Sequence, residues 1–219
     1  MIYSNHATIK YVSYGQASPV VVSSILKAMK SRFADLIFVY RHPLDSLLTN
    51  WIWWRKLIRD RVQISGISQV YNTDDLCADL DLNFLEFKAF AEGDSELFAA
   101  APSKQFVCYQ DYQLRSLFGG HRFLSFPEFV EETELYLQIA TLPSRLEDFM
   151  IDPFKELSKI AKVVSVNLDL SCVRVAPPIT KPYRYLAVKE KVPRFKNFIG
   201  GLDAETKRRI EKMGYDTGV

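Results

Sequence analysis

The segment from Leu36 to Arg55, LIFVYRHPLDSLLTNWIWWR, constrains the fold of this chain more than any other part of its sequence. The residues from Leu36 to Tyr40 form a nearly continuous apolar run, which is typical of a strand covered on both faces. Pro43 suits the first turn of a helix, where the N–H that it lacks has no partner inside the helix. Apolar residues then recur at helical spacing: Leu47, Leu48, Trp51 and Trp54. The sequence therefore predicts a buried strand that leads directly into a helix.

Arg41 follows the predicted strand, at the point where open α/β sheets bind their ligands. Helix N-termini offer free N–H groups there, and a guanidinium group is well suited to a phosphate. Thr49 falls in the second turn of the predicted helix, from which its hydroxyl would reach the same anion. A purely structural interpretation is also open, in which Arg41 pairs with Asp45 and Thr49 is a neutral helix residue.

The segment from Arg41 to Thr49, RHPLDSLLT, resembles the 3′-phosphate-binding segment of the PAPS-dependent sulfotransferases, Arg-x-Pro-x-Asp-x-x-x-Ser. In that family the Arg and the Ser hold the 3′-phosphate of the sulfuryl donor, 3′-phosphoadenosine 5′-phosphosulfate (PAPS). The resemblance implies these two roles for Arg41 and Thr49. Thr49 replaces the family's Ser but keeps its hydroxyl group.

A second segment begins at Thr141, TLPSRLEDFMIDPFKELSKIAKVVSVNLD, and resembles the strand–loop–helix of the same family. Asp152 would cap the helix and Pro153 would occupy its first turn. The apolar residues of this helix share one face: Phe154, Leu157, Ile160, Ala161 and Val164. Leu146 departs from the family pattern, which often has a Tyr near the adenine at this position.

A third segment, from Val188 to Tyr215, resembles the C-terminal part of the family, in which an Arg-Lys-Gly grips the 3′-phosphate. Aligning the two places Lys189 on the Lys of that motif, and Arg194 is a substitute cation for its missing Arg. The resemblance thus implies that Lys189 and Arg194 help to bind the donor. The alternative for this basic segment is a solvated loop before a helix that starts near Asp203.

His6 is the candidate catalytic residue. Cytosolic-type sulfotransferases carry a His that takes the proton from the acceptor hydroxyl, and the resemblance implies this role for His6, although its neighbours differ from the family's. A surface His without a catalytic role is the alternative. The family's phosphosulfate loop, a Pro-Lys-Ser-Gly-Thr-like turn, is missing from the sequence. We therefore expect an N-terminally incomplete form of the fold: truncated, diverged, or completed by another polypeptide.

The composition limits the classes of partner. The net charge of +2 is too balanced for a nucleic-acid-binding surface, and no apolar run reaches the roughly 18 residues of a membrane span. The carboxylates and the three cysteines have no metal-ligand spacing, so we expect no metal. Sparse cysteines without a secretory signal favour the cytoplasm. The oligomeric state does not follow from the sequence.

We expect an α/β fold with a central parallel sheet flanked by helices, because a helix predicted from Ser18 to Phe33 precedes the strand. The resemblance implies the P-loop-NTPase-like sulfotransferase fold in a single domain, 1–219, whose variable region 61–140 lines and covers the acceptor pocket.

The expected reaction transfers a sulfuryl group from PAPS to a hydroxyl or amine acceptor, a small molecule or a carbohydrate, and leaves 3′,5′-ADP. One alternative is a non-catalytic or truncated sulfotransferase-like protein that binds a nucleotide or a partner. Another is an unrelated kinase-like protein, which would need a Walker-type loop that the sequence lacks.

Overall fold

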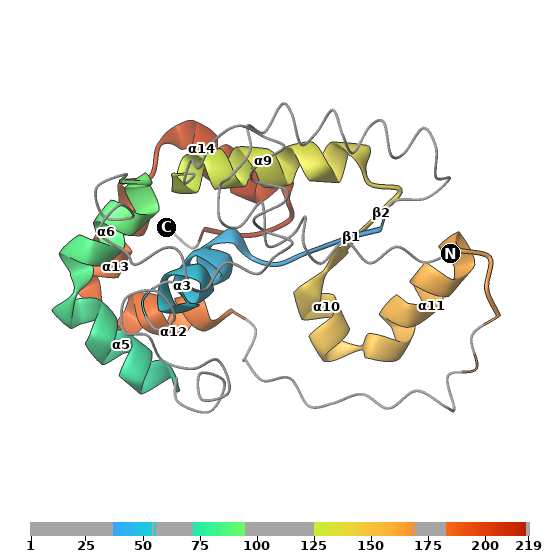
Figure 1. Cartoon of the computed structure of the whole chain (residues 1–219), viewed down its shortest axis with the longest axis horizontal. Helices are drawn as coiled ribbons and strands as arrows, with labels where there is room; N and C mark the ends of the chain where they lie inside the picture. Colours follow the sequence, from blue (N-terminus) through green and yellow to red (C-terminus); the bar gives the residue numbers. More distant parts are fainter. Residues whose placement is uncertain are drawn as a thin grey trace, which may run out of the picture.

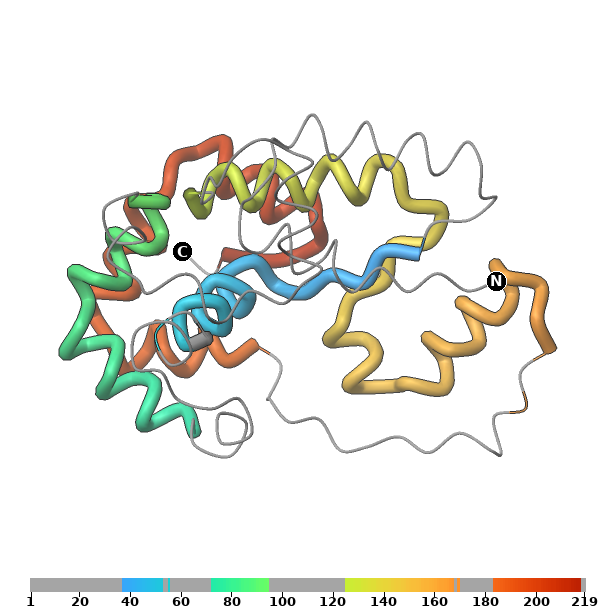
Figure 2. Tube along the Cα trace, in the orientation of Figure 1, coloured from blue at the N-terminus to red at the C-terminus, as the bar shows by residue number. Residues whose placement is uncertain are grey.

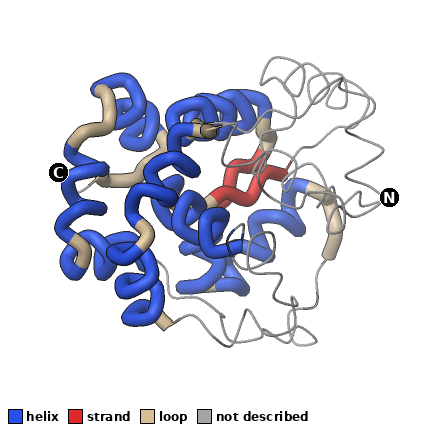
Figure 3. The backbone as a smooth tube through the Cα atoms, turned by 60° about the vertical axis from the view of Figure 1, so that its left-hand side comes forward, coloured by secondary structure: helices blue, strands red, loops and turns tan. Residues whose placement is uncertain are grey.

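The computed structural model describes residues 37–53, 55, 72–94, 125–167, 169 and 183–217, and the account below concerns these residues. Strand β1 (Ile37–Tyr40) pairs in parallel with strand β2 (Leu142–Arg145). In this register Ile37 lies opposite Leu142 and Tyr40 lies opposite Arg145. The two strands lie side by side in the interior, and helices surround them (Figure 3). The described part is therefore mostly helical with a small parallel sheet, which is broadly the predicted α/β class.

The described helices are labelled in Figure 1; four of them lie between β1 and β2 in the chain, and five follow β2. They are α3 (Pro43–Trp53), α5 (Thr73–Leu82), α6 (Phe84–Glu92), α9 (Phe126–Ile139), α10 (Leu146–Ile151), α11 (Pro153–Val163), α12 (Arg184–Lys191), α13 (Pro193–Gly200) and α14 (Ala204–Lys212). Strand β1 leads into α3, and β2 leads into α10. Helix α12 lies beside α3 although most of the chain separates the two in sequence (Figure 1). No helix among the described residues is long and apolar enough to cross a membrane.

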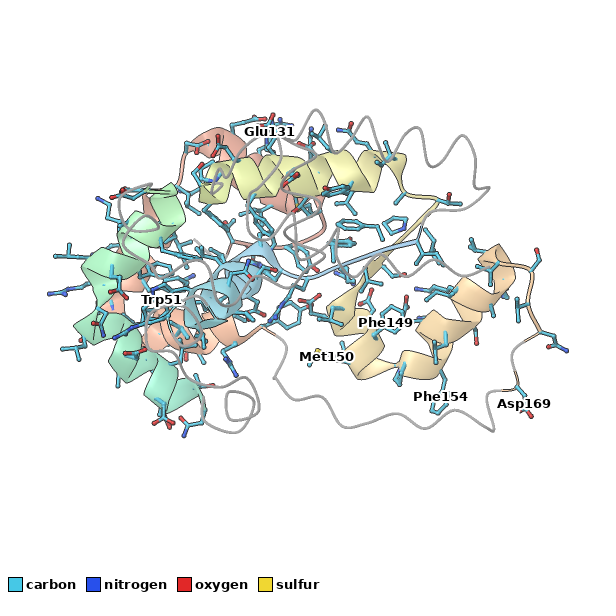
Figure 4. The ribbon with its side chains drawn as sticks, viewed as in Figure 1. Trp51, Glu131, Phe149, Met150, Phe154 and Asp169 are labelled. Carbon is cyan, nitrogen blue, oxygen red and sulfur yellow. The ribbon has the colours of Figure 1, made fainter. Side chains whose placement is uncertain are left out.

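Aromatic side chains join α3, α6 and α13 into the core. The rings of Trp51 and Phe87 meet edge to face with their centroids 5.6 Å apart, and Phe87 meets Phe195 in the same way at 5.7 Å. All three side chains are completely buried, and Figure 4 labels Trp51 in this part of the molecule. Trp51 is therefore a core residue.

The helix ends agree with the caps expected from the sequence. Asp152 accepts a hydrogen bond from a backbone N–H in the first turn of α11, and Asp203 does the same for α14. At the start of α9, Glu128 Oε2 accepts from both the backbone N–H and the hydroxyl of Ser125, at 2.8 Å each. The predicted cap at Asp152 is confirmed, because a cap depends only on residues within one turn.

Burial differs from the expectation in two places. The residues of β1 are only partly buried, since an apolar run fixes hydrophobicity but not how many layers pack against a strand. On α11 the apolar face is partly exposed: Phe154 is 44% exposed and points away from the helix into solvent (Figure 4), whereas Glu156 is buried.

The solvated loop that was the alternative after Val188 is wrong, because helices α12 and α13 occupy this segment. The variable region 61–140 is described only in part, and the helix expected at 18–33 lies outside the described residues.

Candidate functional site

The candidate site lies where the two strands end. Because β1 and β2 are parallel, their carboxyl ends meet at one edge of the sheet, and helices α3 and α10 both begin there (Figure 1). Arg41 and His42 connect β1 to α3, and Glu147 lies in the first turn of α10. This edge is the part of an α/β sheet at which ligands bind.

Arg41 and Thr49 are in direct contact at this edge. Nη1 of Arg41 donates a hydrogen bond to Thr49 Oγ1 at 3.1 Å, and the Thr49 hydroxyl donates to the backbone carbonyl of Asp45 at 2.8 Å. Nη2 of Arg41 also lies 3.7 Å from Asp45 Oδ2, so the ion pair of the structural interpretation is present as well. The Arg41 side chain is 20% exposed, and its Nε is buried without a hydrogen-bond partner among the described residues. Arg41 thus has donor capacity that its ion pair does not use.

Arg184, at the first position of α12, is a second cation at this edge. Burial lowers the pKa of Arg184, and the positive charge of nearby Arg41 lowers it further, while Asp45 opposes the shift. Arg41 and Arg184 are thus close enough to influence each other, and a guanidinium group is well suited to bind an anion. Sequence reasoning missed Arg184, because its place beside Arg41 depends on the packing of α12 against α3 and no local motif marks it.

The other predicted site residues lie elsewhere or outside the described residues. Lys189 is partly buried on α12, and Arg194 is exposed on α13. Neither residue makes a hydrogen bond or an ion pair with Arg41 or Thr49 among the contacts of the described residues. His6 lies outside the described residues. The structure therefore brings together Arg41 and Thr49 and adds Arg184 to them.

Asp45 joins α3 to α12. The backbone N–H of Tyr185, in the first turn of α12, donates to Asp45 Oδ1 at 2.7 Å, and the Asp45 side chain is almost completely buried. Burial raises the pKa of this carboxyl, and Arg41 and the Tyr185 N–H oppose the rise. Asp45 is also an acidic residue in the first turn of α3, and its carboxylate accepts this hydrogen bond from the start of a helix that is distant in sequence.

His42 is buried at the β1–α3 junction, and its polar atoms make hydrogen bonds to several parts of the chain. Its backbone N–H donates to Glu147 Oε1 at 2.9 Å, and its Nδ1 accepts from the Leu44 N–H at 3.1 Å. Its Nε2 lies 3.2 Å from the carbonyl oxygen of Asp216, which can only accept, so this nitrogen bears the proton. Burial lowers the pKa of His42 to about 4, and the ring is neutral near pH 7.

Two tyrosines complete the surroundings of His42. The Tyr185 ring stacks on the imidazole with centroids 4.0 Å apart, and the Tyr215 ring lies at 4.7 Å. The Tyr185 hydroxyl donates to the Asp216 carbonyl at 2.9 Å, and the Tyr215 hydroxyl donates to Glu147 Oε2 at 2.7 Å. Both oxygens of the buried Glu147 carboxylate therefore accept a hydrogen bond.

Because comparisons with known proteins find no match, the geometry of this site is the main guide to function. No protein-family model matches the chain, and no curated protein and no solved structure matches it either. Within the described residues, no group of three or more His, Cys, Asp or Glu side chains is placed to hold a metal ion. What this edge of the sheet offers is a pair of arginines and a hydroxyl, which are the groups that bind phosphate.

Proposed function

We propose that this chain is a sulfotransferase-like protein that binds the 3′-phosphate of PAPS, or of its product 3′,5′-ADP, through Arg41 and Thr49. The observation that supports this most is the 3.1 Å contact between Arg41 Nη1 and Thr49 Oγ1 at the carboxyl end of β1. A guanidinium and a hydroxyl in contact can bind oxygens of one phosphate group, the hydroxyl by exchanging its bond to the Asp45 carbonyl for one to the phosphate. Arg184 supplies the second positive charge.

The arrangement of the resembling segments supports the finer fold assignment, the P-loop-NTPase-like sulfotransferase fold. The Arg41–Thr49 segment follows β1, the Thr141 segment contains β2, and the two strands are parallel neighbours. The third segment begins at Val188, in the second half of α12, a helix that lies against α3. The three segments resemble one family and are far apart in the sequence. They are nevertheless close in space, as the parts of one binding site would be.

The proposed reaction is sulfuryl transfer from PAPS to a hydroxyl or amine acceptor, with His6 as the base that takes the acceptor's proton. Contacts to the 3′-phosphate lie far from the reacting sulfur, so they bind substrate and transition state equally and serve affinity rather than rate. A nucleotide-binding protein without transferase activity would use the same Arg41 and Thr49. The two functions differ in turnover and not in binding.

Calorimetric titration of the full chain with 3′,5′-ADP tests the binding site. We expect Arg41→Ala to weaken binding by roughly 1.5–3 kcal/mol, the usual value of a hydrogen bond to a charged group. Arg208→Ala is the matched control, because Arg208 is an exposed arginine that pairs with Glu205 within α14. Titration with 5′-AMP, which lacks the 3′-phosphate, should show no difference between wild type and Arg41→Ala. Equal affinities of wild type and Arg41→Ala for 3′,5′-ADP would refute the site.

Turnover is measured separately, with radiolabelled PAPS and a panel of phenol, alcohol, sugar and amine acceptors. Labelled product that depends on both the chain and an acceptor establishes the transferase. Binding of 3′,5′-ADP that depends on Arg41, without labelled product, favours the non-catalytic function. His6→Ala then decides whether His6 is the base, since losing the base should lower turnover and leave the affinity for 3′,5′-ADP unchanged.

A further inference from the structure

The C-terminal segment Tyr215–Thr217 is inserted into the candidate site edge although it belongs to no helix or strand. Tyr215 and Thr217 are each 4% exposed. In Figure 2 this red end of the chain runs beside the blue β1–α3 segment, at the other end of the sequence. Irregular segments usually lie on the surface, so burial of this one needs partners for its polar groups.

Those partners belong to the β1–α3 junction and to the helices around it. The Asp216 carbonyl accepts from His42 Nε2 and from the Tyr185 hydroxyl, at 3.2 and 2.9 Å. The Tyr215 hydroxyl donates to Glu147 Oε2, while Oε1 of the same carboxylate accepts from the His42 backbone N–H. His42 is therefore held twice by this segment, directly through its ring and indirectly through Glu147.

Holding His42 also constrains Arg41. The two residues are consecutive, and the His42 amide whose N–H is bound to Glu147 is the peptide bond that joins them. The peptide is planar, so fixing that N–H fixes the orientation of the Arg41 carbonyl and limits the start of its side chain. His42 Nδ1 in turn accepts from the Leu44 N–H, which fixes the first turn of α3, the helix that presents Thr49.

We propose that Tyr215–Thr217 is a clasp that holds the β1–α3 junction in the conformation in which Arg41 and Thr49 can bind a phosphate together. The inference rests on the proposed function for its ligand, and it adds Tyr215, Tyr185 and Glu147 as positioning residues that do not touch the ligand. Binding and clasp formation are thermodynamically linked. If the clasp strengthens phosphate binding, bound phosphate must stabilise the clasp by the same free energy.

The test compares Tyr→Phe variants of the full chain that each delete one buried hydroxyl. Tyr215→Phe removes the bond to Glu147, and Tyr215→Phe combined with Tyr185→Phe also removes one bond to Asp216. Tyr136→Phe is the matched control, since its buried hydroxyl also donates to a glutamate, Glu132, within α9 and not to any residue of the clasp or the junction. Backbone hydrogen exchange at residues 42–46 reports the junction without any ligand, and calorimetry with 3′,5′-ADP reports the site.

We expect Tyr215→Phe to speed exchange at residues 42–46 by about tenfold, and the double variant by more, because a hydrogen bond to a buried carboxylate is lost. The dissociation constant for 3′,5′-ADP should rise several-fold in the same order, and 3′,5′-ADP should slow exchange at 215–217 in wild type. Tyr136→Phe should leave exchange at 42–46 unchanged.

Unchanged exchange at 42–46 in the double variant, or an equal change in Tyr136→Phe, would refute the clasp. Faster exchange with unaltered affinity would also refute it, since the junction would then not position Arg41. If wild type binds no 3′,5′-ADP at all, the proposed function fails, whereas the exchange data still decide whether the segment holds the junction.

Discussion

Two buried glutamates show how differently this molecule accommodates a carboxyl group. Glu147 is 2% exposed at the sheet edge, where its two oxygens accept hydrogen bonds from the His42 N–H and the Tyr215 hydroxyl at 2.9 and 2.7 Å. Glu132 is 1% exposed on α9, where its only hydrogen-bond partner among the described residues is the Tyr136 hydroxyl, at 3.4 Å from Oε1. The second oxygen of Glu132 has no hydrogen-bond partner among the described residues.

The two glutamates are both buried and differ in their hydrogen-bond partners, since Glu147 has two at 2.9 and 2.7 Å and Glu132 has one at 3.4 Å. Desolvation raises the pKa of Glu132 to about 8, and the bond from Tyr136 opposes the rise only slightly, so this side chain is mostly protonated near pH 7. Glu147 accepts hydrogen bonds from the His42 N–H and the Tyr215 hydroxyl, and the rings of these two residues are themselves in contact. One region is a connected polar network, and the other is a single poorly partnered group in an apolar setting.

The largest expected effect tests the partnered glutamate. Glu147→Ala leaves the His42 N–H and the Tyr215 hydroxyl buried without an acceptor and also removes packed atoms. We expect a loss of about 4 kcal/mol or more in the free energy of unfolding, measured by denaturant titration. Glu147→Gln keeps one acceptor oxygen and should lose less. Glu131→Ala, at the exposed glutamate labelled in Figure 4, should change stability by less than about 1 kcal/mol.

A loss for Glu147→Ala as small as that for Glu131→Ala would mean that the network contributes little to stability. Glu147 and Glu132 would then differ in their hydrogen-bond geometry but not in their contribution to stability.

The second prediction concerns Glu132, whose replacement is expected to raise the stability of the protein rather than lower it. The folded state holds the proton of Glu132 up to about pH 8 and the unfolded state releases it near its ordinary value of 4.5. Between these values the folded state binds more protons, so stability falls as the pH rises. Glu132→Gln removes this titration and should therefore be more stable than wild type by roughly 3 kcal/mol near pH 7, with little difference below about pH 4.5.

Denaturant titrations of wild type and Glu132→Gln across this pH range provide the measurement. Parallel pH profiles of the two proteins would show that Glu132 does not titrate on unfolding. Tyr136→Phe is a useful companion, since loss of the remaining donor should raise the pKa of Glu132 further.

The third prediction is the pH dependence of His42. Its folded pKa of about 4 lies below the ordinary 6.5, so the unfolded state binds more protons between these values and stability rises with pH. The contribution is complete above about pH 6.5 and falls by about 2 kcal/mol on acidification to about pH 4.5. The ionisable groups that face His42 come from every element around it: Arg41, Asp45, Glu147, Tyr183, Tyr185, Tyr215 and Asp216.

Because Glu132 and His42 titrate in overlapping ranges with opposite signs, the effect of His42 is best measured in the Glu132→Gln background. Proton NMR should also show one histidine that titrates near pH 4, assigned by its loss in His42→Gln. A histidine signal at position 42 that titrates near 6.5 would show that the ring is not enclosed as described.

Sequence reasoning identified the local features of the site and missed its long-range ones. The β1–α3 junction, the cap at Asp152 and the helix that starts near Asp203 depend on neighbours close in sequence, and each lies as predicted. Arg41 and Thr49 are in contact, and their roles in phosphate binding stay predictions. Arg184, the Asp45–Tyr185 bond and the contact of Asp216 with His42 join parts of the chain more than a hundred residues apart. Such contacts follow from helix packing, which leaves no spacing signal in a single sequence.

The same limit explains Glu132 and Glu147, because both lie near the start or middle of helical patterns as ordinary charged residues. Nothing in the local sequence distinguishes Glu147, which accepts two hydrogen bonds in the folded chain, from Glu132, whose pKa is raised by burial. The roles of His6, Lys189 and Arg194 stay predictions.

The smallest expected effect belongs to Thr49, at the exposed rim of the polar network. Thr49→Val keeps the shape of the side chain but removes the hydroxyl that accepts from Arg41 Nη1 and donates to the Asp45 carbonyl. The residue is partly exposed, so water can replace both bonds, and we expect stability to change by less than about 1 kcal/mol. Affinity for 3′,5′-ADP should fall by roughly 0.5–1.5 kcal/mol, less than for Arg41→Ala, because a neutral donor is lost rather than a charged one. Thr49→Ser restores the hydroxyl and should bind like wild type. If Thr49→Ser is as weak as Thr49→Val, the methyl group rather than the hydroxyl matters, and Thr49 is then a packing residue outside the phosphate site.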